Sequence, residues 1–181
     1  MSRTEFTKAN SDFSDLAHLV ARQCVYPMFF KTANIEYQNT TLSESLSNGK
    51  RDAEQAIDRI CHVAINDKWL DRSLKFTIQE RFRRMRFQEF KDITLTVWNH
   101  ASGLPSELYK IEADYFVYGY YDDIDKVLHD VVIVDVPELK RKIALGALTY
   151  EKGMNKKNQS FISIPFDSLY QAGLIVWHLK G

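Results

Sequence analysis

Two runs of alternating apolar and polar residues, 57–65 and 74–82, constrain the fold more than any other feature of the sequence. Both runs are rich in β-branched and aromatic residues, a composition typical of strands that bury one face. Four residues that favour turns lie between them: Asn66, Asp67, Asp71 and Ser73. The pattern therefore predicts an antiparallel hairpin at the centre of the chain.

The remaining segments can be arranged around this hairpin as one mixed α/β domain spanning 1–181. Residues 1–50 are predicted to be a helical preface and a polar loop: a helix from Ser11 or Ser14 to Phe30, then a loop over 38–51, with a short helical run at 52–56 after it. Further strands are expected at 92–98, within 109–123, and at 130–136, 161–164 and 174–177, with helices at 138–147 and near 166–172 and a polar loop at 152–160. All strands are expected to join a single central sheet flanked by helices, with 130–136 buried on both faces.

Composition sets limits on function. The chain is 45% hydrophobic and 27% charged, enough for one core, but its formal net charge of +0 gives no general attraction for nucleic acid or anionic membranes. Its apolar stretches are all shorter than the roughly 20 residues of a membrane helix, and a polar N-terminus predicts a cytoplasmic protein. Cys24 and Cys61 lack metal-type spacing, the histidines are scattered, and no nucleotide-binding fingerprint is present.

One basic patch follows the hairpin. Its cations are interleaved with Phe82, Phe87 and Phe90; they are Arg81, Arg83, Arg84, Arg86 and Lys91. Such cations can neutralise phosphates while rings support the site or stack on bases, so Arg83, Arg84, Arg86 and Lys91 are candidate nucleic-acid-binding residues. The alternative is a charged strand end with core phenylalanines between the charges.

A metal-dependent reaction on phosphodiesters requires carboxylates that hold the ion and a polar or cationic group near the attacking water. Asp58 on the first run, together with Gln79 and Arg81 on the second, has the arrangement in which a hairpin supplies such groups on one face. Glu80 alternates with Phe76, Ile78 and Phe82, so it is expected on their apolar face unless a bulge turns it. The candidate catalytic residues are Asp58, Gln79, Glu80 and Arg81, and the candidate magnesium ligands are Asp58, Glu80 and Asp92.

These residues resemble the signature of the PD-(D/E)XK nuclease superfamily, an acid on one strand followed by an acid-x-lysine triplet on the next. The resemblance covers mainly positions 50–98 and implies a restriction-endonuclease-like fold, magnesium-dependent cleavage and a glutamate on a preceding helix, for which Glu54 is best placed. Gln79 replaces the acid and Arg81 the lysine, so one negative charge is lost and the cation acts only as a charge. The layout of the later segments also resembles phage or mobile-element proteins of this fold.

Two other placements of the motif are open. Glu138 and Lys140 match acid-x-lysine literally, with Asp114 or Asp135 upstream, but they follow Pro137 and fit the first turn of a helix. Glu107 and Lys110 have helical spacing and are expected to be a surface pair.

Three classes of function follow from these patterns. The leading expectation is a magnesium-dependent endonuclease, with DNA as the favoured partner. The alternatives are a degenerate nuclease fold that only binds nucleic acid through the basic patch, and an interaction or inhibitory module that never meets nucleic acid and that could form a homo-oligomer.

Overall fold

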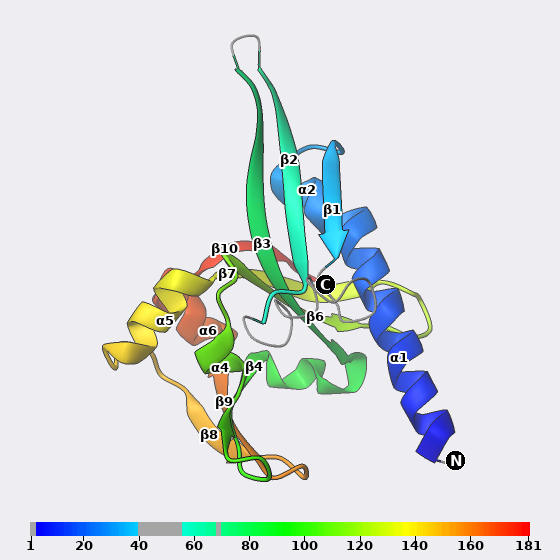
Figure 1. Ribbon diagram of the computed structural model, residues 1–181. Coiled ribbons are helices and arrows are strands. Elements are labelled where there is room, and N and C mark those ends of the chain that lie inside the picture. The colour runs from blue at the N-terminus through cyan, green and yellow to red at the C-terminus, as the bar shows by residue number, and fades with distance from the viewer. Residues whose placement is uncertain (1–2, 40–55, 68–69) are drawn as a thin grey trace.

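The N-terminal part of the chain is one long helical segment in the computed structural model, which describes residues 3–39, 56–67 and 70–181 (Figure 1). Helix α1 (Arg3–Val20) continues through a π-helical turn (Ala21–Val25) into α2 (Tyr26–Phe30). The helix begins earlier than predicted and ends where predicted, at a left-handed Lys31 with φ 54°. Ala17, Ala21 and Val25 are buried along one side, which explains why this segment docks onto the sheet.

A mixed sheet of six strands forms the centre of the molecule, which confirms the predicted fold class. Its spatial order is β1 (Ile35–Asn39), β2 (Arg59–Asp67), β3 (Leu70–Arg84), β6 (Tyr115–Tyr121), β7 (Leu128–Asp135) and β10 (Ile175–Leu179). β3 runs parallel to β6, and every other neighbouring pair is antiparallel. The predicted hairpin is confirmed as β2 and β3, in register from Arg59 with Ile78 to Asp67 with Leu70.

The polar segment after the first helices was only partly predicted. Residues 38 and 39, expected in a loop, belong to β1 and pair with Ile60 and Arg59. The rest of that loop, nearly all of the short helical run and Glu54 lie outside the described residues.

A second sheet holds the segment 92–98, so the prediction of a single sheet is wrong. This antiparallel sheet has the order β5 (Leu104–Pro105), β4 (Asp92–Asn99), β9 (Gln159–Pro165) and β8 (Glu151–Met154). After β3 a 3₁₀ helix (Met85–Phe90) and a left-handed Lys91, φ 44°, turn the chain out of the first sheet. The first residues of the expected loop at 152–160 are in β8.

Three short helices complete the described structure: α4 (Glu107–Lys110), α5 (Val136–Ala144) and α6 (Phe166–Gln171). α5 starts earlier than the predicted 138–147, because the Asp135 carboxylate caps its N-terminus by accepting a 2.8 Å hydrogen bond from the Glu138 amide. The helix also ends earlier than predicted, at Ala144. Glu138 and Lys140 therefore lie in a helix, as their position after Pro137 indicated.

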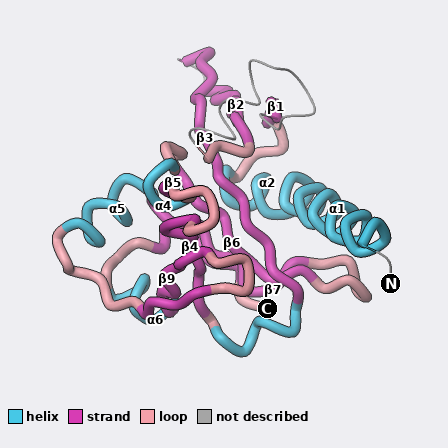
Figure 2. The backbone as a smooth tube through the Cα atoms, turned by 60° about the horizontal axis from the view of Figure 1, so that its bottom comes forward, coloured by secondary structure: helices cyan, strands magenta, loops and turns pink. Residues whose placement is uncertain are grey.

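Two apolar cores lie on opposite faces of the six-stranded sheet. In Figure 2, α1 and α2 lie on one side of β3 and β6, and the second sheet lies on the other with α4, α5 and α6. Along β7, Val131 and Ile133 join the core beneath the N-terminal helices, while Val132 and Val134 join the core beneath the second sheet. The prediction that this strand is buried on both faces is confirmed. Within the described chain, the helices are too short or too polar to span a membrane.

Candidate nucleic-acid interface

β3 separates two different polar environments, because successive side chains of a strand point to opposite faces. Glu80 and Phe82 face the N-terminal helices, where the Phe82 ring packs edge-on against His18 with centroids 5.4 Å apart. Arg81 and Arg83 face the second sheet and bond to the Thr94 carbonyl and the Asp92 carboxylate. The expected placement of Glu80 on the apolar face is confirmed.

Glu80 is held in a buried cluster of donors. Its carboxylate is 2.7 Å from His18 Nδ1 and accepts hydrogen bonds from Arg59 Nε at 2.5 Å and from the Tyr26 hydroxyl. Burial by itself would raise the pKa of Glu80, but His18, Arg59 and Tyr26 outweigh it and hold that pKa below its usual value. Burial and the adjacent carboxylate raise the pKa of the Tyr26 hydroxyl. Glu80 therefore anchors the N-terminal helices to the sheet as a charged group.

The other two predicted magnesium ligands lie elsewhere. Asp58 precedes β2, and its carboxylate accepts a 2.7 Å hydrogen bond from the Glu80 amide. Asp92 accepts a 3.0 Å hydrogen bond from Arg83 and another from the Ser163 hydroxyl, on the face of β3 opposite the Glu80 side chain. Among the described residues, no three His, Cys, Asp or Glu side chains are placed to share a metal ion.

The structure thus does not bring Asp58, Glu80 and Asp92 together, and this donor set does not fit a magnesium ion, which needs converging oxygens. Magnesium binding itself stays a prediction.

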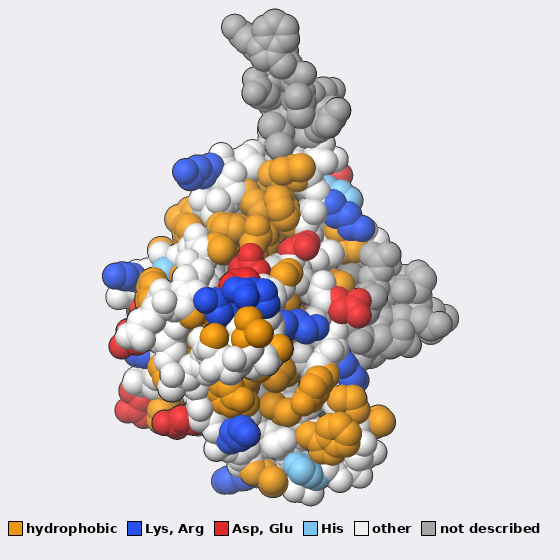
Figure 3. Space-filling view, turned by 90° about the vertical axis from the view of Figure 1, so that its left-hand side faces the viewer, with side chains coloured by type: hydrophobic (Ala, Val, Ile, Leu, Met, Phe, Trp, Pro, Cys, Tyr) orange, Lys and Arg blue, Asp and Glu red, His pale blue; other side chains and the backbone are white. Residues whose placement is uncertain are grey.

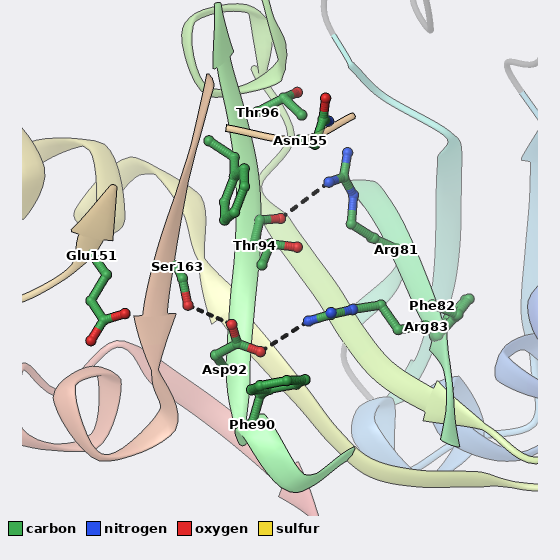
Figure 4. A pocket seen from close by; sticks show the side chains of 11 residues that line it. Arg81, Phe82, Arg83, Phe90, Asp92, Thr94, Thr96, Glu151, Asn155 and Ser163 are labelled. Atoms are coloured by element: carbon green, nitrogen blue, oxygen red, sulfur yellow. Dashed lines mark hydrogen bonds and ion pairs between the residues drawn. The ribbon is translucent and has the colours of Figure 1, made fainter. Parts of the chain in front are cut away.

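A groove of about 660 Å³ lies between β3 and the second sheet (Figure 4). Besides Phe82, its lining residues are Arg81, Arg83, Phe90, Asp92, Thr94, Thr96, Glu151, Asn155, Phe161 and Ser163. In Figure 4 the Arg81 and Arg83 side chains extend from β3 toward β4, and the Phe82 ring points away. Alternation along β4 directs Thr94 and Thr96 into the groove because Ile93 and Leu95 occupy the core.

Arg81 is positioned by a buried acid. Its guanidinium is 2.6 Å from the Glu107 carboxylate and donates a 3.2 Å hydrogen bond to the Thr94 carbonyl. Burial raises the pKa of Glu107 although Arg81 partly opposes the shift, and Glu107 Oε1 has no hydrogen-bond partner among the described residues. Glu107 is therefore a buried residue and not the surface residue that its helical spacing from Lys110 indicated.

Arg83 is held by an acid and by aromatic rings. Besides Asp92, it donates a 3.3 Å hydrogen bond to the Tyr118 hydroxyl and lies 4.3 Å from the Phe87 ring centroid and 5.8 Å from that of Phe90. The Arg81 and Arg83 side chains remain 30% and 22% exposed, so both reach solvent in the groove. Such contacts fix the directions of the guanidinium groups but leave them accessible to a ligand in the groove.

Gln79 and the other candidate cations do not line this groove. Gln79 is buried on the same side of β3 as Arg81, and its Oε1 lacks a partner within the described chain. Arg84 pairs with Asp123, Lys91 lies 2.5 Å from Asp130, and the exposed Arg86 stacks 4.9 Å from the Phe87 centroid. Of the five cations expected in one patch, Arg81 and Arg83 share the groove, whereas Arg84, Arg86 and Lys91 do not line it.

Charges elsewhere are similarly dispersed. On the face drawn in Figure 3, groups of Lys and Arg side chains are separated by acidic, apolar and neutral polar ones.

Sequence reasoning missed the groove residues of the second sheet: Thr94, Thr96, Glu151, Asn155, Phe161 and Ser163. The alternation of 92–98 does show that Thr94 and Thr96 share a face. The pairing of β4 with β9 joins segments about 70 residues apart, such as Asp92 with Pro165, and no local signal announces it.

Few known proteins are similar to this chain. The chain matches no known family model and no curated protein. A solved structure of a nuclease from a fusselovirus is similar with a TM-score of 0.38 and 10% sequence identity, over 91% of this chain and 88% of that chain. A likeness at this level identifies neither a family nor a site.

Proposed function

We propose that this protein binds nucleic acid through the groove, with Arg81 and Arg83 contacting phosphate oxygens. The supporting observation is that two arginines at alternate positions of β3 direct their guanidiniums into the same open cavity. Arginine is suited to this contact because its planar fork of donors matches the geometry of a phosphate.

Both arginines keep donors for a ligand. A guanidinium carries five N–H groups, and the bonds from Arg83 to described residues use only Nη1. Arg81 contacts Glu107 through Nη2 and donates to Thr94 through Nη1. Arg81 and Arg83 are thus prepositioned, which lowers the entropy lost when a phosphate binds.

Binding fits these residues better than hydrolysis. Glu80, the carboxylate nearest the acid position of the motif, is enclosed by His18, Tyr26 and Arg59 on the far side of β3. Gln79 carries no charge, and Asp92 is paired with Arg83. The proposed function is therefore the binding alternative rather than the endonuclease.

Fluorescence anisotropy with labelled oligonucleotides tests the proposal. Changing Arg81→Gln with Arg83→Gln should weaken binding roughly 10- to 100-fold at low salt, because two charge-assisted contacts are lost. The salt slope should also fall by about 0.7 to 0.9 per contact removed. The matched control is Arg141→Gln with Lys142→Gln on α5, which removes the same charge away from the groove and should change affinity little.

Equal losses in the two double variants would contradict the assignment to the groove. A cleavage assay with magnesium adds a separate arm: cleavage by the parent that Asp58→Ala abolishes would show that the protein is an enzyme and that the binding-only proposal is wrong.

A further inference from the structure

The face of the second sheet that lines the groove is organised in rows across the strands. Cross-strand partners in an antiparallel sheet share a face. Thr96 of β4 is opposite Phe161 of β9, which is opposite Gly153 of β8. The next row contains Thr94, Ser163 and Glu151. An aromatic ring is thus placed on a face that is otherwise polar.

Gly153 leaves room for that ring. A Cβ atom built on Gly153 would lie 2.4 Å from Phe161 Cζ and 2.8 Å from Cε1, so a side chain at this position would require the Phe161 ring to move. The Phe161 ring therefore lies across the backbone of β8 in the space that a side chain at 153 would fill. With one side against Gly153, the ring is held in place while it still lines the groove. Phe90, 57% exposed, also lines the groove.

The two walls of the groove carry opposite charges. Its ionisable lining residues are Arg81, Arg83, Asp92 and Glu151, two of each sign. A groove with this balance cannot attract a phosphate backbone by charge alone, since affinity from phosphates depends on uncompensated cations. Arg81 and Arg83 belong to the β3 wall, whereas the acid Glu151 lies across the groove on β8 (Figure 4). A phosphate is favoured on the first wall and an uncharged group on the second.

We infer that the groove takes an unpaired base of a single strand, stacked on Phe161, with the adjoining phosphate on Arg81 and Arg83. The inference rests on the proposed function and names its substrate class. A base has an aromatic face for the ring, and stacking supplies the affinity that charge does not. The hydroxyls of Thr96 and Ser163 are bonded to Ser106 and Asp92, but their oxygens have further lone pairs that can accept hydrogen bonds from the N–H groups of a base edge. In a duplex the base faces are covered by neighbouring bases, so they cannot reach Phe161.

The test compares a labelled single-stranded oligonucleotide with its duplex, using the full chain. The parent should bind the single strand at least tenfold more tightly. Phe161→Leu should weaken single-strand binding roughly 5- to 150-fold, the range expected for one lost base stack, and leave duplex binding unchanged. Phe161→Tyr keeps an aromatic face for stacking and should bind the single strand as tightly as the parent does. Tyr109→Leu, which removes a 62% exposed ring outside the groove, is the matched control and should have no effect.

Gly153→Ala provides an independent check, because it displaces the Phe161 ring without removing it. We expect a loss of single-strand affinity in a protein that keeps the parent circular dichroism spectrum. Equal affinity for single strand and duplex, with Phe161→Leu unchanged and the Arg81 and Arg83 variant weakened, would overturn this inference and leave the proposed function standing. Absence of binding to either oligonucleotide would overturn both.

Discussion

At the scale of single residues, Glu80 connects separate parts of the fold. Its carboxylate is completely buried, and its donors come from different elements: His18 from α1, Tyr26 from α2 and Arg59 from β2. A buried charge is tolerated only when such partners replace the water it has lost. The cluster therefore determines how the N-terminal helices are positioned on the sheet.

Removal of this carboxylate should be strongly destabilising. We expect Glu80→Ala to lower the free energy of unfolding by about 3–5 kcal/mol, because the ion pair between Glu80 and the buried Arg59 is lost together with the hydrogen bonds from His18 and Tyr26. Urea denaturation measures the change, with the exposed Glu112→Ala as a control that should stay within about 0.5 kcal/mol. Adding Arg59→Met to the Glu80 variant should recover part of the loss. A Glu80→Ala protein as stable as the control would refute the structural role.

The same residue predicts a dependence on pH. The pKa of Glu80 is lower in the folded protein than its usual 4.5, so the unfolded chain binds more protons as the pH falls below about that value. The stabilisation from the ionised Glu80 is complete above pH 4.5 and is lost as the pH falls through the pKa of Glu80 in the folded protein. Glu80→Gln should therefore flatten the acid side of a plot of unfolding free energy against pH, and Glu112→Gln should not. Parallel curves for the parent and Glu80→Gln would contradict the assignment.

At this scale the sequence predicts which face of β3 each side chain occupies but not which residues it contacts. Period-2 alternation was enough to separate Glu80 from Arg81, because it depends only on neighbouring residues. The partners of these side chains could not be predicted, since Glu107 and Tyr26 meet β3 only after distant segments pack. An acid-x-cation motif thus gives residue types and faces, while the charges that neutralise them are set by tertiary structure.

At the scale of elements, the strands were easier to predict than their partners. The β2–β3 hairpin followed from two adjacent runs and a turn, and β7 from its unbroken apolar composition. The sheet to which β4 belongs was not predictable, because the change of direction occurs in the 3₁₀ helix at Met85–Phe90 and at the left-handed Lys91. Arg86 and Phe87 in that segment had suggested only a basic patch.

The contact between α1 and the sheet gives a prediction for an element. Ala17 is fully buried there, so a longer side chain would have to displace its packed neighbours. Ala17→Leu should lower the free energy of unfolding by about 1–3 kcal/mol through overpacking. Gln23→Leu, at an exposed position of the same helical segment, is the control in urea denaturation. If both variants unfold at the same urea concentration, the helix does not pack as described.

At the scale of the whole molecule, the six-stranded sheet contributes to both apolar cores. Val131 and Val132, consecutive residues of β7, lie in different cores, so neither core can be lost without exposing this strand. Unfolding should therefore be a single cooperative transition. Circular dichroism and tryptophan fluorescence should give the same urea midpoint, also in Trp98→Phe and Trp177→Phe, which remove reporters from the second sheet and from β10. Separate midpoints would show that the layers unfold independently.

The two-sidedness of β3 also has an evolutionary consequence. One residue inserted after Ile78 would reverse every later side chain of the strand, turning Glu80 toward the groove and Arg81 toward the N-terminal helices. The anchoring cluster would be lost in one step together with the proposed phosphate contacts, although the composition of the strand would hardly change. Descendants of this chain can exchange side chains along β3 one at a time, but a change of its length by one residue here would need a β-bulge to keep both faces.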